Sequence, residues 1–300
     1  MHRSYKVALL ALSICASAAA IHAQIKDDDV ITVDSSIVLL NAAVTDTAGR
    51  AVTGLTQKQF TVLEDGVEQP IDIFAAESTP FAAVILLDTS GSMEQRVSMA
   101  RSAAIEFLYG LRGEDFAAIY RFDANVKMVQ DFSNSRDIAE SIFDLKANGM
   151  TALNDAIFKA ASLLSTRTEK RRAIIVLSDG ADTNSGKSSD AALKAAIAAN
   201  ATIYTIDMSS PDERGADRVQ NQGALKNYAS KSGGTFVASP GGPAMRNAFK
   251  QIVQELGSQY TIAYTPTNTK KDGKFRAIEV RVARSGLTIR TRKGYNAPKK

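Results

Sequence analysis

The chain has 300 residues, 45% of them hydrophobic, so it is long enough for one large domain or two smaller ones. Its 36 Lys and Arg against 32 Asp and Glu give a net charge of +4, which argues against a general polyanion partner such as nucleic acid. Its one cysteine and both histidines fall within the first 23 residues, as Cys15, His2 and His22.

Residues 1–23 have the pattern of a secretory signal peptide. Arg3 and Lys6 precede the apolar run 7–20, and Ala23 offers a small residue before a cleavage point. The run is shorter than the roughly 20 apolar residues that a transmembrane helix needs, and no later segment has an apolar run of that length. We therefore expect an exported protein, periplasmic or extracellular, whose mature chain has no membrane span; the alternative is that the segment is retained as a signal anchor.

Cleavage after Ala23 would leave a mature chain without histidine or cysteine. Such a chain has no Ser-His-Asp or Cys-His nucleophile, no zinc site built on those residues and no disulfide. Only carboxylates, lysines and tyrosines then remain as candidate acids and bases.

Residues 24–79 are expected to form β structure. The stretch 30–44 is rich in aliphatic and β-branched residues, and 60–63 and 71–74 are expected to be short strands. Asp65-Gly66 is a strong hairpin-turn signal between them. The segment predicts a small sandwich-like module.

The stretch after this module combines a buried strand with a polar motif. Phe81–Leu87 is a continuous apolar run, typical of a strand buried on both faces of a parallel sheet. From Met93 onward the apolar residues are three or four apart, which predicts a helix. Asp88, Ser90 and Ser92 are therefore expected at the carboxyl end of a central strand and at a helix N-terminus, where open α/β sheets bind ligands.

Strands and helices alternate over residues 80–257. The further expected strands are 116–122, 126–132, 173–177, 202–206 and 235–237, and the further expected helices are near 138–145, 151–164, 191–199, 225–229 and 244–256. This alternation predicts an α/β fold with a doubly wound, mostly parallel sheet. The tight turn 123–125 predicts that 126–132 is an antiparallel edge strand.

Residues 258–300 return to β structure, with expected strands at 259–265, 275–282 and 287–292. We expect these strands to pack with the N-terminal module, which makes the α/β domain an insertion in a sandwich built from both ends of the chain. Residues 270–300 hold eleven Lys or Arg against two acidic residues, a local charge of +9. This excess fits either a patch for an acidic surface or, as we favour, the solvent face of edge strands.

Two more oxygen side chains are expected at the same edge as the first motif. Thr151 precedes a predicted helix, and Asp179 ends the buried strand that follows it. The carboxyl ends of parallel strands share one edge, so Asp88, Ser90, Ser92, Thr151 and Asp179 are expected to meet there. Carboxylate and hydroxyl oxygens suit a hard cation such as Mg²⁺. The alternative is that these residues are ordinary turn and cap residues.

This arrangement resembles the von Willebrand factor type A domain, whose metal-ion-dependent adhesion site has an Asp-x-Ser-x-Ser, Thr and Asp pattern in this order. The resemblance covers about 80–257. It implies that Ser90, Ser92 and Thr151 contact Mg²⁺ or Mn²⁺ through their hydroxyls, and that Asp88 and Asp179 act directly or through water. It also implies a coordination position left for an Asp or Glu of a partner protein.

The flanks resemble those of the VWFA-related proteins described from Acidobacteria. The matching segments are Val44-Thr45-Asp46, Asp65-Gly66, Tyr264-Thr265-Pro266 and Lys293-Gly294-Tyr295. The resemblance thereby extends over nearly the whole mature chain.

Partner selection is a possible role for the loop 209–217, which is expected at the metal-bearing edge. Its acidic residues Asp212 and Glu213, together with Asp182, are candidate partner contacts, although the loop fits an ordinary long connection equally well.

Two enzymatic readings compete with the binding site. The segment 180–188 resembles a phosphate loop, but it has one residue too many between its glycines, and Asp179 and Asp182 would repel a phosphate. Metal-assisted hydrolysis would need Asp123, Asp182 or Glu94 as a base, and these also fit solvated loop acids. We therefore predict a non-catalytic adhesion or scaffold protein, with a hydrolase or a structural envelope component as the alternatives.

Overall fold

The computed structural model describes residues 37–76, 79–135, 140–147, 149–210, 215–238 and 242–299. The expected signal peptide lies outside the described residues. None of the described helices is both long and apolar enough to span a membrane.

The central sheet has the strand order β10-β9-β8-β5-β6-β7. Its strands are β5 (Phe81–Asp88), β6 (Phe116–Phe122), β7 (Val126–Ser133), β8 (Arg171–Ser178), β9 (Ala201–Asp207) and β10 (Phe236–Val237). All neighbours are parallel except β6 and β7, which pair antiparallel at one edge. The structure thus confirms the predicted α/β fold class, including the antiparallel edge strand.

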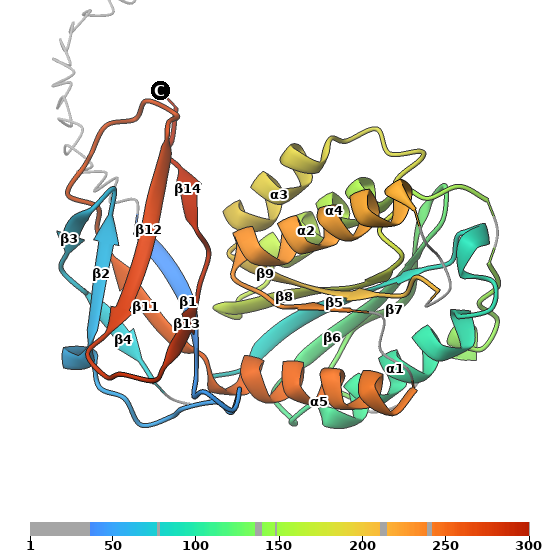
Figure 1. Cartoon of the computed structure of the whole chain (residues 1–300), viewed down its shortest axis with the longest axis horizontal. Helices are drawn as coiled ribbons and strands as arrows, with labels where there is room; N and C mark the ends of the chain where they lie inside the picture. The colour runs from blue at the N-terminus through green and yellow to red at the C-terminus, as the bar shows by residue number, and fades with distance from the viewer. Residues whose placement is uncertain are drawn as a thin grey trace, which may run out of the picture. The chain divides into compact units, whose positions relative to one another are not determined.

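Helices cover both faces of this sheet, as Figure 1 shows. One face carries α1 (Val97–Gly110) and α5 (Gly242–Ser258), and the other carries α2 (Leu153–Ser165), α3 (Ser189–Ala198) and α4 (Ala216–Ser232). Every residue of β5 is buried because alternate side chains enter the two cores, Ile85 on the α1 side and Val84 on the α2 side. This double burial explains the continuous apolar run.

Two predicted helices near the metal-site motif differ in the structure. The helix expected from Met93 begins at Val97, and Gly91–Met93 forms a 3-10 helix, η2. The prediction of a helix near 138–145 is wrong in type, because Glu140–Ile142 forms only a 3-10 helix, η3. Single apolar residues at helical spacing are too few there to bury a whole helix face.

Two helices later in the chain also differ from expectation. Helix α4 is much longer than the expected 225–229, because its first three turns are polar and give no periodic signal. Helix α3 is capped by Ser188 rather than by Ser189-Asp190. The Ser188 hydroxyl accepts a hydrogen bond from the Ala191 N–H, 3.2 Å away.

The flanking segments form two four-stranded sheets, β13-β1-β11-β4 and β14-β12-β2-β3. Their strands are β1 (Val38–Thr45), β2 (Phe60–Glu64), β3 (Val67–Gln69), β4 (Ile73–Ala75), β11 (Tyr260–Tyr264), β12 (Phe275–Val282), β13 (Thr288–Arg290) and β14 (Gly294–Asn296), and a 3-10 helix, η1 (Gln57–Gln59), precedes β2. Strands from both ends of the chain pair directly, as in β1 with β11 and β2 with β12.

One apolar core joins these two sheets into a sandwich, with Leu40 and Ile262 on one sheet and Val62 and Ile278 on the other. The predicted Asp65-Gly66 turn forms, with φ of 50° and 82° at its two residues, but it joins β2 to β3. The strand expected at 71–74 corresponds to β4, which belongs to the other sheet and pairs with β11. Strands β3 and β14 were not expected, because three-residue strands leave almost no periodic signal.

Candidate metal centre

Asp88 is the last residue of β5, and its side chain is fully buried at the carboxyl edge of the sheet. One carboxylate oxygen, Oδ1, accepts a hydrogen bond from the Ser90 N–H at 2.9 Å. The other, Oδ2, accepts one from the Ser178 hydroxyl at 2.5 Å. The hydroxyls of Ser90 and Ser92 lie 3.1 Å apart. These contacts fix the carboxylate and gather three oxygen side chains of the motif.

Backbone hydrogen bonds tie the other two loops to this one. The Gly91 N–H donates to the Gly149 carbonyl at 3.1 Å, which joins the motif to the segment that carries Thr151. The Thr151 carbonyl in turn accepts from the N–H groups of Thr183 and Asn184, both at 2.9 Å. Three loops distant in sequence therefore meet at one edge of the sheet.

The two remaining candidate ligands are held close to this junction. Thr151 and Asp179 are 4% and 6% exposed, so both are nearly buried. The Thr151 N–H donates to the Thr183 hydroxyl at 3.0 Å, and Asp179 Oδ1 accepts from the Ala181 N–H at 3.0 Å. The Asp179 side chain is consequently anchored by its own loop backbone, and the Thr151 backbone is anchored by a side chain of the neighbouring loop.

Electrostatics at this edge favour a cation. The pKa of Asp88 is raised to about 7, chiefly by burial and also by the nearby charge of Asp179. Hydrogen bonds from Ser178 and Ser90 oppose these effects only in part. A bound divalent ion would remove this electrostatic penalty, so the charge state of the site fits a metal.

The donor set fits a hard cation that keeps some of its water. It contains two carboxylates and three hydroxyls, the ligand types that Mg²⁺ takes in proteins. Within the described ranges, no group of three or more His, Cys, Asp or Glu could hold a metal. A cation at this edge would therefore depend on the hydroxyls as much as on the carboxylates.

Sequence reasoning missed Ser178 as a positioning residue. Its hydroxyl donates to Asp88 and accepts from the Gly180 N–H at 3.0 Å, so it links β5 to the turn after β8. A hydroxyl residue at the last position of a buried strand, directly before a candidate ligand, is the signal that would have found it.

The candidate partner contacts are only partly described. Asp182 is exposed and accepts hydrogen bonds from the N–H groups of Asn154 at 3.4 Å and Ser185 at 3.2 Å. Asp212 and Glu213 lie outside the described residues. Of the candidate bases, Asp123 forms an ion pair with Arg121 at 2.7 Å, and Glu94 is exposed.

The loop after β8 is not organised as a phosphate loop. The N–H groups of Gly186 and Lys187 donate to the Asp155 carboxylate at 2.9 and 2.8 Å. An acidic side chain from α2 thus occupies the backbone donors that would otherwise face a phosphate. This geometry argues against a phosphate-binding loop at 180–188.

The fold is that of a doubly wound α/β domain, and the oxygen-rich edge lies at the carboxyl ends of its strands, where open α/β sheets bind their ligands. Residues 83–181 match the family model of the von Willebrand factor type A domain, a range that contains all five candidate ligands. The central part of the chain is therefore similar to the von Willebrand factor type A domain.

Similar proteins cover different parts of the chain. The inter-alpha-trypsin inhibitor heavy chain H3 of Bos taurus is 27% identical over 135 residues, which are 39% of this chain and 15% of that protein's length. A von Willebrand factor type A structure from Catenulispora acidiphila has 15% identity and a TM-score of 0.50, and the match covers 89% of this chain and 75% of that one.

The von Willebrand factor domain of the type V pili tip protein Mfa5 from Porphyromonas gingivalis also has 15% identity and a TM-score of 0.50. That match covers 60% of this chain and 95% of the other. At this identity, both structural matches show the fold alone.

Proposed function

We propose that the chain is an exported, non-catalytic protein that binds a partner protein through a Mg²⁺ or Mn²⁺ ion at the carboxyl edge of its sheet. The residues that would hold the ion are Asp88, Ser90, Ser92, Thr151 and Asp179. One observation carries the proposal: a buried carboxylate with a raised pKa lies where three hydrogen-bonded loops gather the oxygen side chains.

Bound there, the ion would supply an electrophilic centre for an acidic side chain of a partner. The chain's own residues provide few direct charges, since three of the five candidate ligands are neutral hydroxyls. A carboxylate from another protein would then gain more from the ion than it would at an all-carboxylate site. This is why we propose an Asp or Glu as the recognised group.

We propose a binding role outside the cytoplasm by analogy with a structural neighbour. One structural neighbour is a domain of a type V pili tip protein. By analogy, we propose adhesion or scaffolding as the role, and a periplasmic or extracellular location that agrees with the expected signal peptide. The experiments described below would determine the partner, the preferred ion and the oligomeric state.

The direct test is calorimetric titration of Mg²⁺ and Mn²⁺ into the wild-type protein and into Asp88→Ala and Thr151→Ala variants. We expect binding to the wild type and none to the variants, whose fold, checked by circular dichroism, stays largely intact. If only the wild type binds the metal ion, the next experiment is a pull-down of partner proteins with and without EDTA. Partner binding that survives both substitutions and EDTA would refute the proposal.

Two alternatives give different outcomes in the same experiments. A metal-assisted hydrolase would show turnover that requires both the ion and a nearby carboxylate such as Asp123 or Asp182. A structural envelope component would show no metal affinity in the wild type, with or without a partner.

A further inference from the structure

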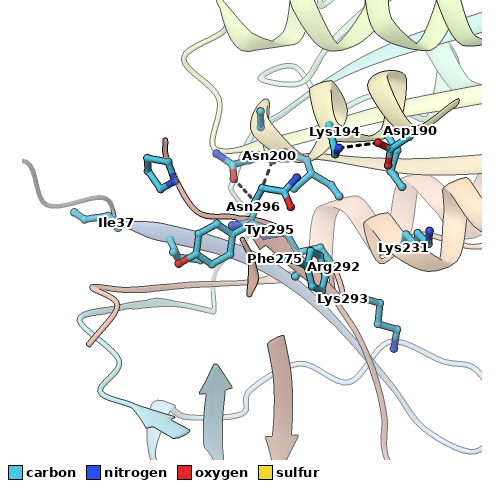
Figure 2. A pocket seen from close by; sticks show the side chains of 16 residues that line it. Ile37, Asp190, Lys194, Asn200, Lys231, Phe275, Arg292, Lys293, Tyr295 and Asn296 are labelled. Atoms are coloured by element: carbon cyan, nitrogen blue, oxygen red, sulfur yellow. Dashed lines mark hydrogen bonds and ion pairs between the residues drawn. The ribbon is translucent and has the colours of Figure 1, made fainter. Parts of the chain in front are cut away.

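A second candidate site lies at the opposite edge of the α/β domain. A cavity of about 960 Å³ separates α3 from β12 and β14, a volume typical of ligand sites. Asn200, on its wall, directly precedes β9, so this wall of the cavity lies at the amino end of a parallel strand. Figure 2 shows the lining residues. Asp88 and Asp179 are at the carboxyl ends. The cavity is therefore separate from the candidate metal centre.

The walls of this cavity, which we call the α3–β14 pocket, are mainly apolar. The apolar lining residues are Ile37, Val38, Leu193, Ile197, Ala198, Phe275, Tyr295 and Pro298. Two of them remain more than half exposed, Ile37 at 54% and Phe275 at 55%. An occupant with an apolar side chain would bury this surface.

Cations outnumber acids around the pocket. Its lining includes Lys194, Lys231, Arg292 and Lys293 but only one acid, Asp190. Asp190 forms an ion pair with Lys194 at 2.7 Å, which leaves three further positive charges (Figure 2). The pocket therefore favours an anionic occupant.

Arg292 gives the strongest sign of an absent anion. Its Nη1 donates to two neutral oxygens, the Ile197 carbonyl and Asn200 Oδ1, both at 3.1 Å. Its Nε is buried and, among the described residues, has no hydrogen-bond partner. Because an unmet buried donor on a charged group is costly, a carboxylate beside it would be strongly favoured.

The pocket also borders a free strand edge. Strand β14 is the end strand of its sheet and pairs only with β12 among the described strands. The Lys293 carbonyl accepts from the Ile278 N–H of β12 at 2.9 Å, and the Ala297 N–H donates at 2.8 Å to the carbonyl of Lys274, the residue directly before β12. Alternate residues of an antiparallel strand point opposite ways, so the backbone groups of Gly294 and Asn296 face away from β12. Both residues line the pocket.

We propose that the α3–β14 pocket binds an extended, acidic segment of a partner protein, which adds as a strand to β14. Its backbone would pair with Gly294 and Asn296, an apolar side chain would enter the cavity, and a carboxylate would meet Arg292 and Lys293. An apolar ligand alone would leave Arg292 Nε without an acceptor, and an anionic amphiphile would leave the strand edge unused. This site goes beyond the proposed metal-dependent function and does not depend on it.

The test uses a fluorescein-labelled ten-residue peptide of alternating Val and Asp, with fluorescence anisotropy on the full-length protein. The comparison peptide alternates Val and Lys. Asn296→Pro removes the outward N–H but no bond to β12, and Pro is tolerated on edge strands. We expect Asn296→Pro to weaken binding of the Val-Asp peptide about tenfold, whereas Asn296→Ala, which keeps the N–H, changes it less than about twofold.

A second pair of variants tests the charge. Lys231→Glu combined with Lys293→Glu, both exposed or at the rim, should abolish binding of the Val-Asp peptide, and circular dichroism checks that the variant folds. Binding should persist in EDTA and in Asp88→Ala, because the metal centre is at the other edge. That result separates this site from the proposed function, since either one can fail alone.

Several outcomes would overturn the inference. Equal binding of the Val-Lys peptide would exclude an acidic segment, and wild-type affinity in Asn296→Pro would exclude strand addition. Displacement of the peptide by decanoate, with decanoate binding unaffected by Asn296→Pro, would assign the pocket to an anionic amphiphile. Self-association in analytical ultracentrifugation that Asn296→Pro abolishes would identify a second copy of the chain as the occupant.

Discussion

Asp88 combines deep burial with hydrogen bonds that hold it in one orientation. Its pKa rises from an ordinary value near 3.8 to about 7, chiefly because burial removes water from the carboxylate. In the metal-free protein the folded state thus holds this proton more tightly than the unfolded chain does. The contribution of Asp88 to the free energy of unfolding therefore falls as the pH rises from about 4 to 7.

Metal binding should show the opposite pH dependence. An ion needs the ionised carboxylate, so it must displace the Asp88 proton below the pKa of about 7. We expect Mg²⁺ affinity to fall about tenfold between pH 8 and pH 6. Calorimetry in two buffers of different ionisation enthalpy should show proton release approaching one per ion at pH 6 and none at pH 8.5. An affinity that is the same at pH 6 and pH 8 would contradict this assignment.

Ser178 positions Asp88 without being a candidate ligand. In Ser178→Ala the carboxylate loses a hydrogen bond of 2.5 Å, so its pKa should rise further and its orientation loosen. We expect metal affinity to fall about tenfold, the usual loss for a residue that orients a ligand. Ser162→Ala is the control, because that hydroxyl bonds only its own helix backbone at Phe158. Equal affinities for the two variants would assign Ser178 a merely structural role.

At the scale of elements, the turn after β8 is held against α4. Gly180 has a φ of +87°, and a Cβ added there would lie 2.5 Å from the Asn221 carbonyl oxygen of α4. Helix backbone cannot yield to such a contact without moving the whole element. Since Gly180 follows Asp179, this packing also fixes one candidate ligand.

Gly180→Ala should therefore destabilise the protein by about 2–4 kcal/mol. The matched control is Gly223→Ala in the interior of α4, where a Cβ meets no atom within 4 Å. That variant should gain about 0.5–1 kcal/mol, because alanine favours the helix. Urea unfolding followed by circular dichroism measures both. An unchanged free energy of unfolding in Gly180→Ala would contradict this prediction, because it would mean that the turn can move away from α4 at little cost.

At the scale of the whole described chain, a buried arginine connects the α/β domain to the sandwich. Arg171, at the start of β8, is fully buried. Its guanidinium donates to the carbonyls of Leu256 and Gly257 at 3.4 and 3.3 Å and to that of Gln259, where α5 leads into β11. It thereby satisfies carbonyls at the helix end that α5 itself cannot satisfy.

Arg171→Met should cost about 3 kcal/mol, because it leaves these buried carbonyls without donors. Arg246→Met, on the exposed face of α5, is the control and should change stability by less than about 0.5 kcal/mol. Because the chain has no tryptophan, tyrosine fluorescence and circular dichroism are the probes for urea unfolding. Equal stability of the two variants would show that water replaces the guanidinium.

Long, periodic elements were predictable, and short or polar ones were not. The sequence pattern predicts β5 and α2, because each element has many apolar residues in a regular pattern. Helix α4 was underestimated and β14 was missed, since the first is mostly polar and the second has three residues. In both cases contacts with the rest of the fold, rather than local preference, stabilise the element.

By itself, the sequence determined the α/β class, the antiparallel edge strand and the five oxygen side chains that are candidate ligands. These features follow from residue type and spacing along one strand or helix. Only the tertiary structure decided that Ser178 holds Asp88, that η2 precedes α1, and that Arg292 borders an apolar pocket beside a free strand edge. Each of these depends on residues far apart in the chain, whose distances and burial are set by packing and not by local pattern.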